Sequence, residues 1–378
     1  MLVKTEPIKL GPVEKTESQR IENILVQNYG WEIEPGTLAR FLEKTASSRV
    51  YQIKIKGLGL KVIKDSFWYG GQSEEEKRKS LAALEKAYKI SEALRKKGVA
   101  LPEVFLNKQG KFITQFESSY FTALDFLTGE HFSSRDEEFT ASGAVLAFFH
   151  KKGAEYLLEN PAEKETIEKL IPAEKPYEES RQMYENFLRE DLLKPHQCGF
   201  PEVCRSFREN IEAIDETIKF IDSSGVLSPD LSNGILYNDF HTNNALFTPD
   251  GSFSGFLDID QIGVGPFVWD LGNTLASFAS NFLTRTPGAD FEPKARFFLK
   301  AYHREFSLPL KEYELCLAAT QRWDVMRILR TLRRHRYENN RLPELLPKVS
   351  DRLIPRIIAA PKVFSFITED WLKRNLAD

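Results

Sequence analysis

The stretch of sequence that decides the fold is Tyr237–Phe247, which reads Y-N-D-F-H-T-N-N-A-L-F. Asp239 and Asn244 lie five residues apart in its polar part, and the stretch ends in the apolar run A-L-F. The turn-forming sequence P-D-G at 249–251 then sends the chain back along a second apolar run, which ends at Asp258. The spacing therefore predicts a β-hairpin that brings three oxygen-bearing side chains together.

Hard oxygen ligands, few in number and without thiolate or imidazole partners, suit Mg²⁺ bound jointly with the phosphates of a substrate. Asp260 follows Asp258 by two residues, so on an extended segment it points to the same side. It is either a second metal ligand or a surface acid. The alternative for the whole segment is a hairpin rich in Asp and Asn whose carboxylates are only solvated.

Together with L-D-I-D at 257–260, the stretch resembles the motif H-G-D-x-H-x-x-N-x-L-F and its following I-D in one superfamily. That superfamily comprises aminoglycoside phosphotransferases, choline kinases and homoserine kinases, and it has the protein-kinase-like fold. Residues 266–272 (P-F-V-W-D-L-G) are similar to the element that supports the family's catalytic loop. Residues 124–129 resemble its hinge, and residues 144–150 resemble its L-A-x-L-H helix.

The resemblance spans about residues 45–335 and implies an α+β fold with two lobes. A small antiparallel β-rich lobe for the nucleotide would occupy residues 1–125, and a larger helical lobe for catalysis and the acceptor would occupy residues 126–378. ATP, or less favoured GTP, is expected between the lobes. Its base would bond to the backbone near Asp125 and Leu127.

Carried over residue by residue, the resemblance implies a role for each side chain of the hairpin. Asp239 takes the position of the catalytic base, which orients the substrate hydroxyl or accepts its proton. Asn244 and Asp258 take the positions that bind Mg²⁺, with Asp260 as an additional candidate ligand. Phosphoryl transfer depends on positioning and charge neutralisation, so three oxygen side chains and a lysine nearly suffice.

The lysine that holds the nucleotide phosphates is expected on the third strand of the small lobe. We choose Lys61 because its neighbours are apolar, and Lys64 and Lys54 are the other candidates. Each of the three could instead be an ordinary surface lysine on a strand. The expected partner of Lys61 is Glu85, on the Leu-rich side of a helix predicted over residues 74–97, although a solvated Glu is about as compatible with the pattern.

Two features depart from the family pattern. No glycine-rich phosphate loop precedes the first β-run, and Ser47 and Ser48 are expected to reach the phosphates instead. The family's His-Gly before the catalytic Asp is replaced by Tyr237 and Asn238. Tyr can hold the loop through its hydroxyl, and Asn tolerates the left-handed backbone that Gly would provide.

Hydrophobic periodicity supports the two-lobed organisation. Residues 49–55 and 58–64 alternate as two β-strands joined by a turn, and a further strand is predicted at 103–106. Beyond Gly129 the pattern becomes helical apart from a β-rich island at 235–258. The predicted helices cover residues 136–151, 161–170, 176–193, 202–223, 291–306, 310–338 and 363–375.

Composition excludes several other classes of protein. The 378 residues carry a formal charge of only −3, which gives no overall field for nucleic acid or an anionic membrane. The first fifteen residues contain Lys, Glu and Pro where a secretory signal would be apolar, and no apolar run is long enough to span a membrane. Three cysteines are too few for a disulfide framework. We therefore expect a cytoplasmic protein.

Two charged segments favour opposite acceptors. The predicted helix 321–336 contains six arginines, of which Arg327, Arg330 and Arg334 share one face. The default interpretation is that these arginines are solvated or paired with carboxylates. The more specific interpretation is that they form an anion-binding wall of the acceptor pocket. The glutamate-rich segment 154–191 would instead suit a cationic acceptor.

We predict an ATP- and Mg²⁺-dependent small-molecule kinase that transfers the γ-phosphoryl group to an alcohol group of a metabolite or antibiotic. One alternative is a non-catalytic pseudokinase with a binding or structural role, as some spore-coat relatives are thought to be. Another is a protein kinase. The eleven residues 259–269 between Asp258 and Asp270 are too few for a peptide-docking segment, which disfavours this last alternative.

Overall fold

The structure is a computed structural model that describes residues 15–37, 39–44, 48–66, 73–117, 119–172, 175–194, 201–337 and 346–376. The chain forms two compact units, Met1–Thr128 and Gly129–Asp378. The boundary lies close to the predicted one at residue 125. We describe each unit by itself.

The first unit contains an antiparallel sheet with the strand order β1-β2-β3-β5-β4. The two alternating runs predicted from the sequence form its centre, as β2 (Ser48–Ile55) and β3 (Gly59–Ser66). The sheet is completed by β1 (Arg40–Lys44), β4 (Thr114–Phe116) and β5 (Ser119–Asp125). Successive side chains of a strand face opposite sides of the sheet, so the elements that cover each side decide which residues are buried.

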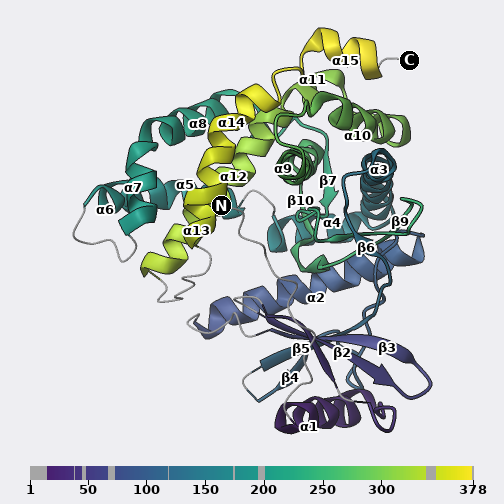
Figure 1. Cartoon of the computed structure of the whole chain (residues 1–378). Helices are drawn as coiled ribbons and strands as arrows, with labels where there is room; N and C mark the ends of the chain where they lie inside the picture. The colour runs from purple at the N-terminus through teal and green to yellow at the C-terminus, as the bar shows by residue number, and fades with distance from the viewer. Residues whose placement is uncertain are drawn as a thin grey trace. The chain divides into compact units, whose positions relative to one another are not determined.

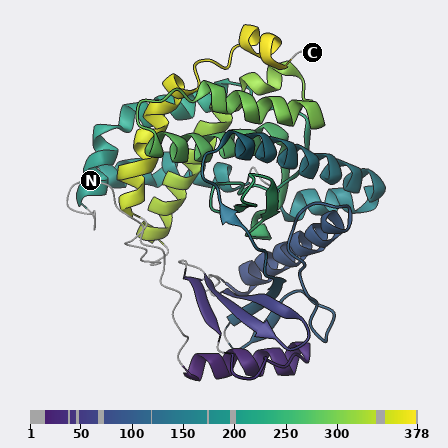
Figure 2. The same cartoon turned by 45° about the vertical axis from the view of Figure 1, so that its right-hand side comes forward.

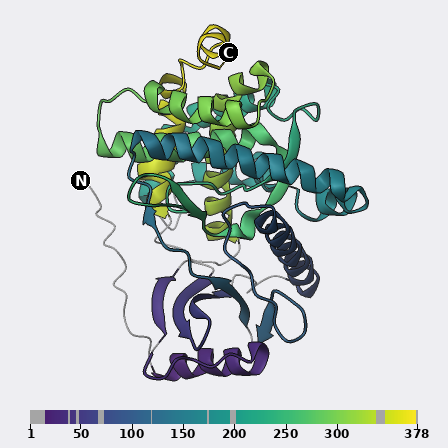
Figure 3. The same ribbon diagram turned by 90° about the vertical axis from the view of Figure 1, so that its right-hand side faces the viewer.

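Helix α1 (Lys15–Ile24) and the π-helical turn η1 (Leu25–Tyr29) cover one side of this sheet. The core there combines Ile21, Ile24 and Leu25 with side chains from β2, β3 and β5, namely Tyr51, Ile53, Ile55, Ile63, Phe121 and Ala123. Helix α2 (Glu74–Lys96) lies on the opposite side of the sheet from α1 in all three views (Figures 1, 2 and 3).

A capping box begins α2 where the sequence predicted a helix. The Ser73 side chain accepts from the Glu76 backbone N–H at 3.2 Å, and the Glu76 carboxylate accepts from the Ser73 backbone N–H at 2.8 Å. The strand predicted at 103–106 is wrong. Only one isolated bridge forms there, between Val104 and Leu124, with backbone hydrogen bonds of 2.9 Å from Phe105 to the Ala123 carbonyl and from Asp125 to the Glu103 carbonyl.

The second unit is mainly helical. Its long central helices are α3 (Asp136–Glu159), α9 (Phe267–Arg285), α10 (Glu292–Glu305) and α12 (Cys316–Tyr337). The remaining helices are α4 (Pro161–Leu170), α5 (Lys175–Met183), η2 (Tyr184–Leu188), α6 (Arg189–Leu193), α7 (Pro201–Glu209), α8 (Ile211–Ser223), α11 (Leu310–Glu314), α13 (Leu346–Lys348), η6 (Val349–Leu353), α14 (Ile354–Val363) and α15 (Glu369–Leu376).

Helix α9, like α14, is absent from the helices predicted from the sequence. It packs tightly on α12, because a Cβ added to Gly272 would come within 2.5 Å of the Ala319 side chain. The β-rich island predicted beside it is present as two small sheets. One pairs β7 (Asn233–Leu236) with β10 (Gly263–Pro266). The other has the order β6 (Glu130–His131), β8 (Ala245–Phe247) and β9 (Phe253–Phe256).

Aromatic packing forms the core of the second unit around these sheets. Phe240 contacts Phe256 at 4.9 Å and Phe278 at 5.8 Å between ring centroids, and Phe132 lies 4.3 Å from Phe278. Such pairs combine a large buried apolar area with a preferred tilted or edge-to-face geometry. Several of the 28 Phe residues therefore pack around the loop that carries Asp239.

Within the described ranges, no helix is both long and apolar enough to cross a membrane. Cys316 is a free, buried thiol whose pKa is raised to about 12 by burial. Cys204 is disulfide-bonded.

Candidate active site

The loop between β7 and β8 (Ala245–Phe247) carries Asp239 and begins with the two residues that depart from the family pattern. Asn238 has a φ of 71°, so it adopts the left-handed conformation that was expected of it. Tyr237 is fully buried, but its hydroxyl finds no hydrogen-bond partner among the described residues. The expectation that this hydroxyl holds the loop is therefore wrong, and the ring acts through packing on Phe256 at 4.9 Å.

Three polar side chains on one face of α9 hold the loop by its backbone. The Asp270 carboxylate accepts from the backbone N–H groups of Tyr237 at 2.7 Å and Asn238 at 2.8 Å. The Asn273 amide donates to the Asn238 carbonyl at 3.1 Å, and the Ser277 hydroxyl accepts from the Thr242 backbone N–H at 3.3 Å. The spacing i, i+3, i+7 places all three on the same side of a helix.

Asp270 is itself held from behind by His150 of α3. The His150 Nε2 lies 3.0 Å from the Asp270 carboxylate, and its Nδ1 lies 2.6 Å from the Tyr302 hydroxyl. Since Asp270 and His150 are both almost completely buried, this chain of hydrogen bonds fixes the position of the carboxylate. The supporting role that the resemblance implied for the segment containing Asp270 agrees with this geometry.

Asp239 and Asn244 are in direct contact at the centre of the loop. The Asn244 side-chain N–H donates to the Asp239 carboxylate at 3.1 Å and to the Asp239 backbone carbonyl at 3.0 Å. His241 lies beside them, with its Nε2 3.6 Å from the same carboxylate, and its Nδ1 accepts from the Asn243 backbone N–H at 3.2 Å. The Asp239 carboxylate keeps 19% of its surface exposed, so it is held in place and still accessible.

The predicted hairpin brings Asp258 next to Asn244. Strand β8 pairs with β9 (Phe253–Phe256), and the Leu257 backbone N–H donates to the Asn244 carbonyl at 2.9 Å. Asp258 has a φ of 53°, and a short 3₁₀ helix, η4 (Ile259–Gln261), follows it. The expectation that Asp260 lies on an extended segment is therefore wrong, because the chain turns at Asp258 and the alternation of sides is lost.

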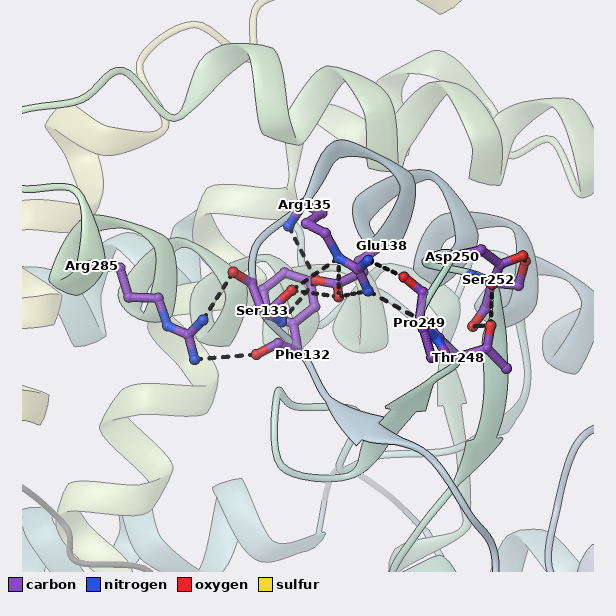
Figure 4. A network of polar contacts seen from close by, with 9 residues as sticks. All are labelled: Phe132, Ser133, Arg135, Glu138, Thr248, Pro249, Asp250, Ser252 and Arg285. Carbon is purple, nitrogen blue, oxygen red and sulfur yellow. Dashed lines mark hydrogen bonds and ion pairs between the residues drawn. The ribbon is translucent and has the colours of Figure 1, made fainter.

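The far end of this hairpin is held by Arg135, the residue before α3, and Arg285 of α9 bonds to the same segment as Arg135 (Figure 4). The Arg135 guanidinium donates to the Pro249 carbonyl at 2.6 Å, and it also pairs with the buried Glu138 carboxylate at 2.8 Å. Arg285, the last residue of α9, donates to the Ser133 carbonyl at 2.9 Å. The turn of the hairpin and the helix that holds the Asp239 loop are therefore tied to the same short segment.

Four carboxylates of the site act electrostatically on Tyr237. Burial raises its pKa well above the ordinary value, and the nearby charges of Asp258, Asp239, Asp260 and Asp270 raise it further. Asp239, Asp258 and Asp260 belong to the loop and hairpin described above, and Asp270 holds that loop, so the four carboxylates share one small region of the second unit. The region is strongly acidic, and a bound cation would relieve its repulsion.

The chemistry of this donor set fits Mg²⁺ together with substrate phosphates. Asn244 directs its side-chain N–H to Asp239, so its amide oxygen can serve as a metal ligand. Asp258 is exposed to solvent. Among the described residues, no three His, Cys, Asp or Glu side chains form a group that could hold a metal alone. Mg²⁺ ordinarily uses one or two protein carboxylates and takes its other ligands from phosphates and water, so the fit does not need such a group.

In the first unit, Lys61 lies on the side of the sheet that α1 covers, together with Ile63 and Asp65. It is only 6% exposed, and its ammonium donates to the Asp125 carboxylate at 2.7 Å and to the Leu58 carbonyl at 2.6 Å. Asp65 on the same side pairs with Arg20 of α1 at 3.2 Å. The expected pair between Lys61 and the α2 glutamate is therefore wrong, and Asp125 takes the place of that partner.

Lys64 lies on the other side of β3, because it is one residue beyond Ile63. Ser48 is on that side too, since the strand register places Val50 opposite Lys64 and Ser48 opposite Ser66. Ser47, the other predicted phosphate-binding serine, lies outside the described residues. Leu127 follows β5 and is half-buried.

Glu85 contributes to the first unit in a way that the sequence did not suggest. Its carboxylate accepts from the backbone N–H groups of Phe112 at 2.9 Å and Ile113 at 3.2 Å. It therefore connects α2 to the segment that leads into β4. Asn273 and Ser277 were also missed, although polar residues at helical spacing inside an apolar stretch are a readable signal.

The sequence model of the phosphotransferase enzyme family matches residues 39–293. No curated protein matches the chain. Among solved structures, the chain is similar to a spectinomycin phosphotransferase in complex with ADP and spectinomycin, with a TM-score of 0.60 and 16% identity over 93% of this chain and 99% of that one.

Two further structures show the same likeness. An amicoumacin kinase in complex with AMP-PNP and Ca²⁺ has a TM-score of 0.59 and 15% identity over 90% of this chain and 93% of that one. A microcompartment-associated aminopropanol kinase has a TM-score of 0.57 and 14% identity over 92% of this chain and 98% of that one. At these identities the likeness shows a common fold, and the predicted α+β kinase-like fold is confirmed.

Proposed function

Because the chain belongs to the phosphotransferase enzyme family, we propose that it is an ATP- and Mg²⁺-dependent kinase that phosphorylates a hydroxyl of a small molecule. The observation that carries this proposal is the contact between Asp239 and Asn244 at 3.1 Å, inside a hairpin that ends at Asp258. Phosphoryl transfer requires a base, a metal site and fixed geometry more than covalent chemistry.

In this proposal Asp239 orients the acceptor hydroxyl and takes its proton as the new bond to phosphorus forms. Asn244 and Asp258 would hold Mg²⁺, which neutralises charge on the transferred group when it is bound. Asp260 remains a candidate for a further ligand. The buried support from Asp270 keeps the loop from rearranging during turnover, which is what catalysis by positioning demands.

The nucleotide would bind to the first unit, with the backbone near Asp125 and Leu127 bonded to its base. We assign the phosphate-binding lysine to Lys64 instead of Lys61. Lys64 shares its side of the sheet with Ser48 and α2, whereas Lys61 is engaged on the α1 side. ATP is favoured over GTP, and Ser47 and Ser48 would contact the phosphates through backbone and hydroxyl groups.

A matched pair of variants tests the choice of lysine. Lys64→Met is expected to weaken Mg-ATP binding by about tenfold or more, because a lysine–phosphate contact is charge-assisted. Lys61→Met should leave nucleotide affinity nearly unchanged while it lowers the stability of the first unit. Isothermal titration with AMP-PNP measures both affinities. A loss of affinity in Lys61→Met alone would reverse the assignment.

Metal-dependent nucleotide binding is the first experimental test of the proposed function. At about 100 times its dissociation constant, Mg-ATP should stabilise the wild type by about 2.7 kcal/mol, seen as a rise of a few degrees in Tm. Asp258→Asn should lose the part of this shift that needs Mg²⁺. Asp230→Asn, which removes an exposed carboxylate from the turn before β7, is the matched control and should keep the full shift.

The main alternative is a non-catalytic protein with a pseudokinase role. It would be favoured if neither Mg-ATP nor Mg-GTP stabilised the wild type. A protein acceptor is disfavoured by the segment after Asp258, because residues 263–266 form strand β10 and pair with β7. That pairing leaves little chain with which to dock a peptide. If nucleotide binding is present, a screen of hydroxyl compounds by ADP release will then identify the acceptor.

A further inference from the structure

A groove lies between two helices of the second unit, α10 and α15, which contact one another (Figure 1). It consists of two hollows with volumes of about 590 Å³ and about 350 Å³. The hollows adjoin, because Arg296, Arg374 and Asn375 line both of them. In the part of the chain that the structure describes, no lining residue belongs to the Asp239 loop or to the hairpin that follows it, so the groove is separate from the proposed catalytic site.

The α15 wall of the groove is attached to α10. The Trp371 Nε1 donates to the Glu292 carboxylate at 3.0 Å, and the ring centroids of Trp371 and Phe366 lie 5.2 Å apart. Trp371 is only 7% exposed, so it anchors the helix as a buried aromatic side chain with its N–H satisfied. The groove is therefore a fixed feature of the fold.

The smaller hollow is lined by cations and by no carboxylate among the described residues. Its charged side chains are Arg296, Lys300 and Arg304 of α10 and Arg374 of α15. All four are exposed, and none makes an ion pair or a side-chain hydrogen bond with another described residue. The dipole of α10 accounts only for Arg304 in its last turn. Like charges gathered in one hollow repel one another, and a bound anion relieves that repulsion.

The two carboxylates of the larger hollow are engaged at the start of α10. Asp290 accepts from the Glu292 backbone N–H at 3.0 Å, and the Glu292 side chain accepts from Trp371. Lys362 of α14 adds a further cation to this hollow. The positive charge of the groove therefore increases along α10 towards Arg304.

The three cations of α10 form a regular row. Arg296, Lys300 and Arg304 are four residues apart, so they share one face of the helix at intervals of about 6 Å along its axis. Alternate side chains of an extended peptide share one face at intervals of about 6.6–6.8 Å. Acidic residues at every second position of such a peptide can therefore meet successive cations of the row. Phe297 lines the same hollow at 37% exposure and offers an apolar contact.

Other ligands fit the groove less well. A small-molecule site ordinarily buries most of its ligand and fixes it with a few enclosed polar groups, whereas these four cations are all exposed. A single nucleic-acid strand needs aromatic rings on which its bases stack. Trp371 is buried and Phe366 is half-buried, which leaves Phe297 as the one exposed ring among the described lining residues.

A second copy of this chain is a poor source of acidic residues for the groove. Several glutamates of its segment 154–191 pair with lysines of their own helices. Glu155 pairs with Lys152 at 2.8 Å, and Glu165 pairs with Lys169 at 2.5 Å. The complementary charge is therefore better supplied by another protein.

We propose that the groove between α10 and α15 binds an extended acidic segment of another protein, whose alternate Asp or Glu carboxylates pair with Arg296, Lys300 and Arg304. Arg374 would contact the same segment from the opposite wall. A guanidinium matches a carboxylate by two parallel hydrogen bonds. Exposed ion pairs are individually weak and are screened by salt, so binding should need several of them at once and should weaken as salt is added. The inference goes beyond the proposed kinase function and does not depend on it.

Fluorescence anisotropy with defined probes tests the groove before the partner is known. The probe is a labelled peptide of about eight residues in which Glu alternates with Thr, a residue that favours an extended chain. Wild type is expected to bind it saturably, and more weakly at higher salt. A peptide with Lys in place of Glu should not bind, and a peptide of the same composition with its Glu residues consecutive should bind more weakly.

Lys300→Gln/Arg304→Gln should reduce the affinity for the alternating peptide by about tenfold. Both side chains are exposed, so this variant should unfold at the wild-type Tm and keep the stabilisation by Mg-ATP. Arg205→Gln/Lys219→Gln removes the same charge from exposed positions on α7 and α8, and as the matched control it should bind the peptide normally. Arg374→Gln tests the opposite wall and should give a smaller reduction.

Four results would overturn the inference. The first is a wild type without saturable binding of the alternating peptide, and the second is a Lys300→Gln/Arg304→Gln variant that binds it as tightly as the matched control. The third is equal binding of the peptide with consecutive Glu, which would exclude the alternate pairing. The fourth is tighter binding of a labelled oligothymidylate of the same length, which would assign the groove to nucleic acid. Because Mg-ATP binding is measured separately, none of these results contradicts the kinase proposal.

Discussion

Asp239→Asn is expected to lower kcat by about 10²–10⁴-fold while nucleotide affinity stays almost unchanged. The replacement keeps the shape of the side chain and one oxygen that can still accept from Asn244, which now lies 3.1 Å away. It removes the ability to take a proton from the acceptor hydroxyl. The loss should therefore appear in turnover and not in binding of Mg-ATP, which the thermal shift measures separately.

The measurement is ADP release with the acceptor that the screen identifies, under saturating Mg-ATP. Asp230→Asn serves again as the control for loss of one carboxylate, and it should retain wild-type turnover. Full activity in Asp239→Asn would show that another group handles the proton. A parallel fall in nucleotide affinity would show instead that the substitution had disturbed the metal ligands.

The site in the second unit could be predicted because its chemistry is local in sequence. Asp239, Asn244 and Asp258 belong to one hairpin, and a turn with alternating apolar residues fixes how far apart its ends lie. The left-handed backbone at Asn238 was also predictable, because few residues other than Gly accept it readily. The α+β fold followed from the family resemblance of these same residues.

The first unit was predicted less well because the choice of the phosphate-binding lysine depends on which side of the sheet α1 covers. Lys61 and Lys64 lie on opposite sides of β3, and the sequence pattern fits either orientation. Only the packing of α1 against Ile63 decides it. The Glu85 contacts to the backbone of another segment are equally long-range, so no local pattern reveals them.

The arginines of α12 and the glutamates of residues 154–191 also could not be interpreted from the sequence alone. Sequence spacing places the α12 arginines on one face, but it does not say which of them meet a carboxylate. Asp324 of the same helix pairs with Arg356, which comes from a different helix and occupies both carboxylate oxygens. That pairing depends on tertiary contacts alone.

Asp270→Ala should be the most destabilising single change at the site. Asp270 is 1% exposed and accepts hydrogen bonds from two backbone N–H groups and from the His150 ring, so its removal leaves two buried polar groups and one half-buried one without their partner. Each buried group left unpaired costs roughly 1–3 kcal/mol. We expect a loss of at least about 3 kcal/mol in the free energy of unfolding by urea, which is a large part of ordinary domain stability.

Two companion variants separate the support of the loop from general stability. Tyr302→Phe removes only the far hydrogen bond of the chain and should cost about 1 kcal/mol with kcat nearly unchanged. Asp270→Asn keeps one acceptor oxygen, so its stability should fall between wild type and alanine. Because the carboxylate acts through the Asp239 loop, Asp270→Asn should also lower kcat at a temperature where it is fully folded, while KM for ATP holds. If kcat stayed at the wild-type value in that variant, the loop would not depend on Asp270 for its catalytic geometry, and rigidity would have to come from Asn273 and Ser277.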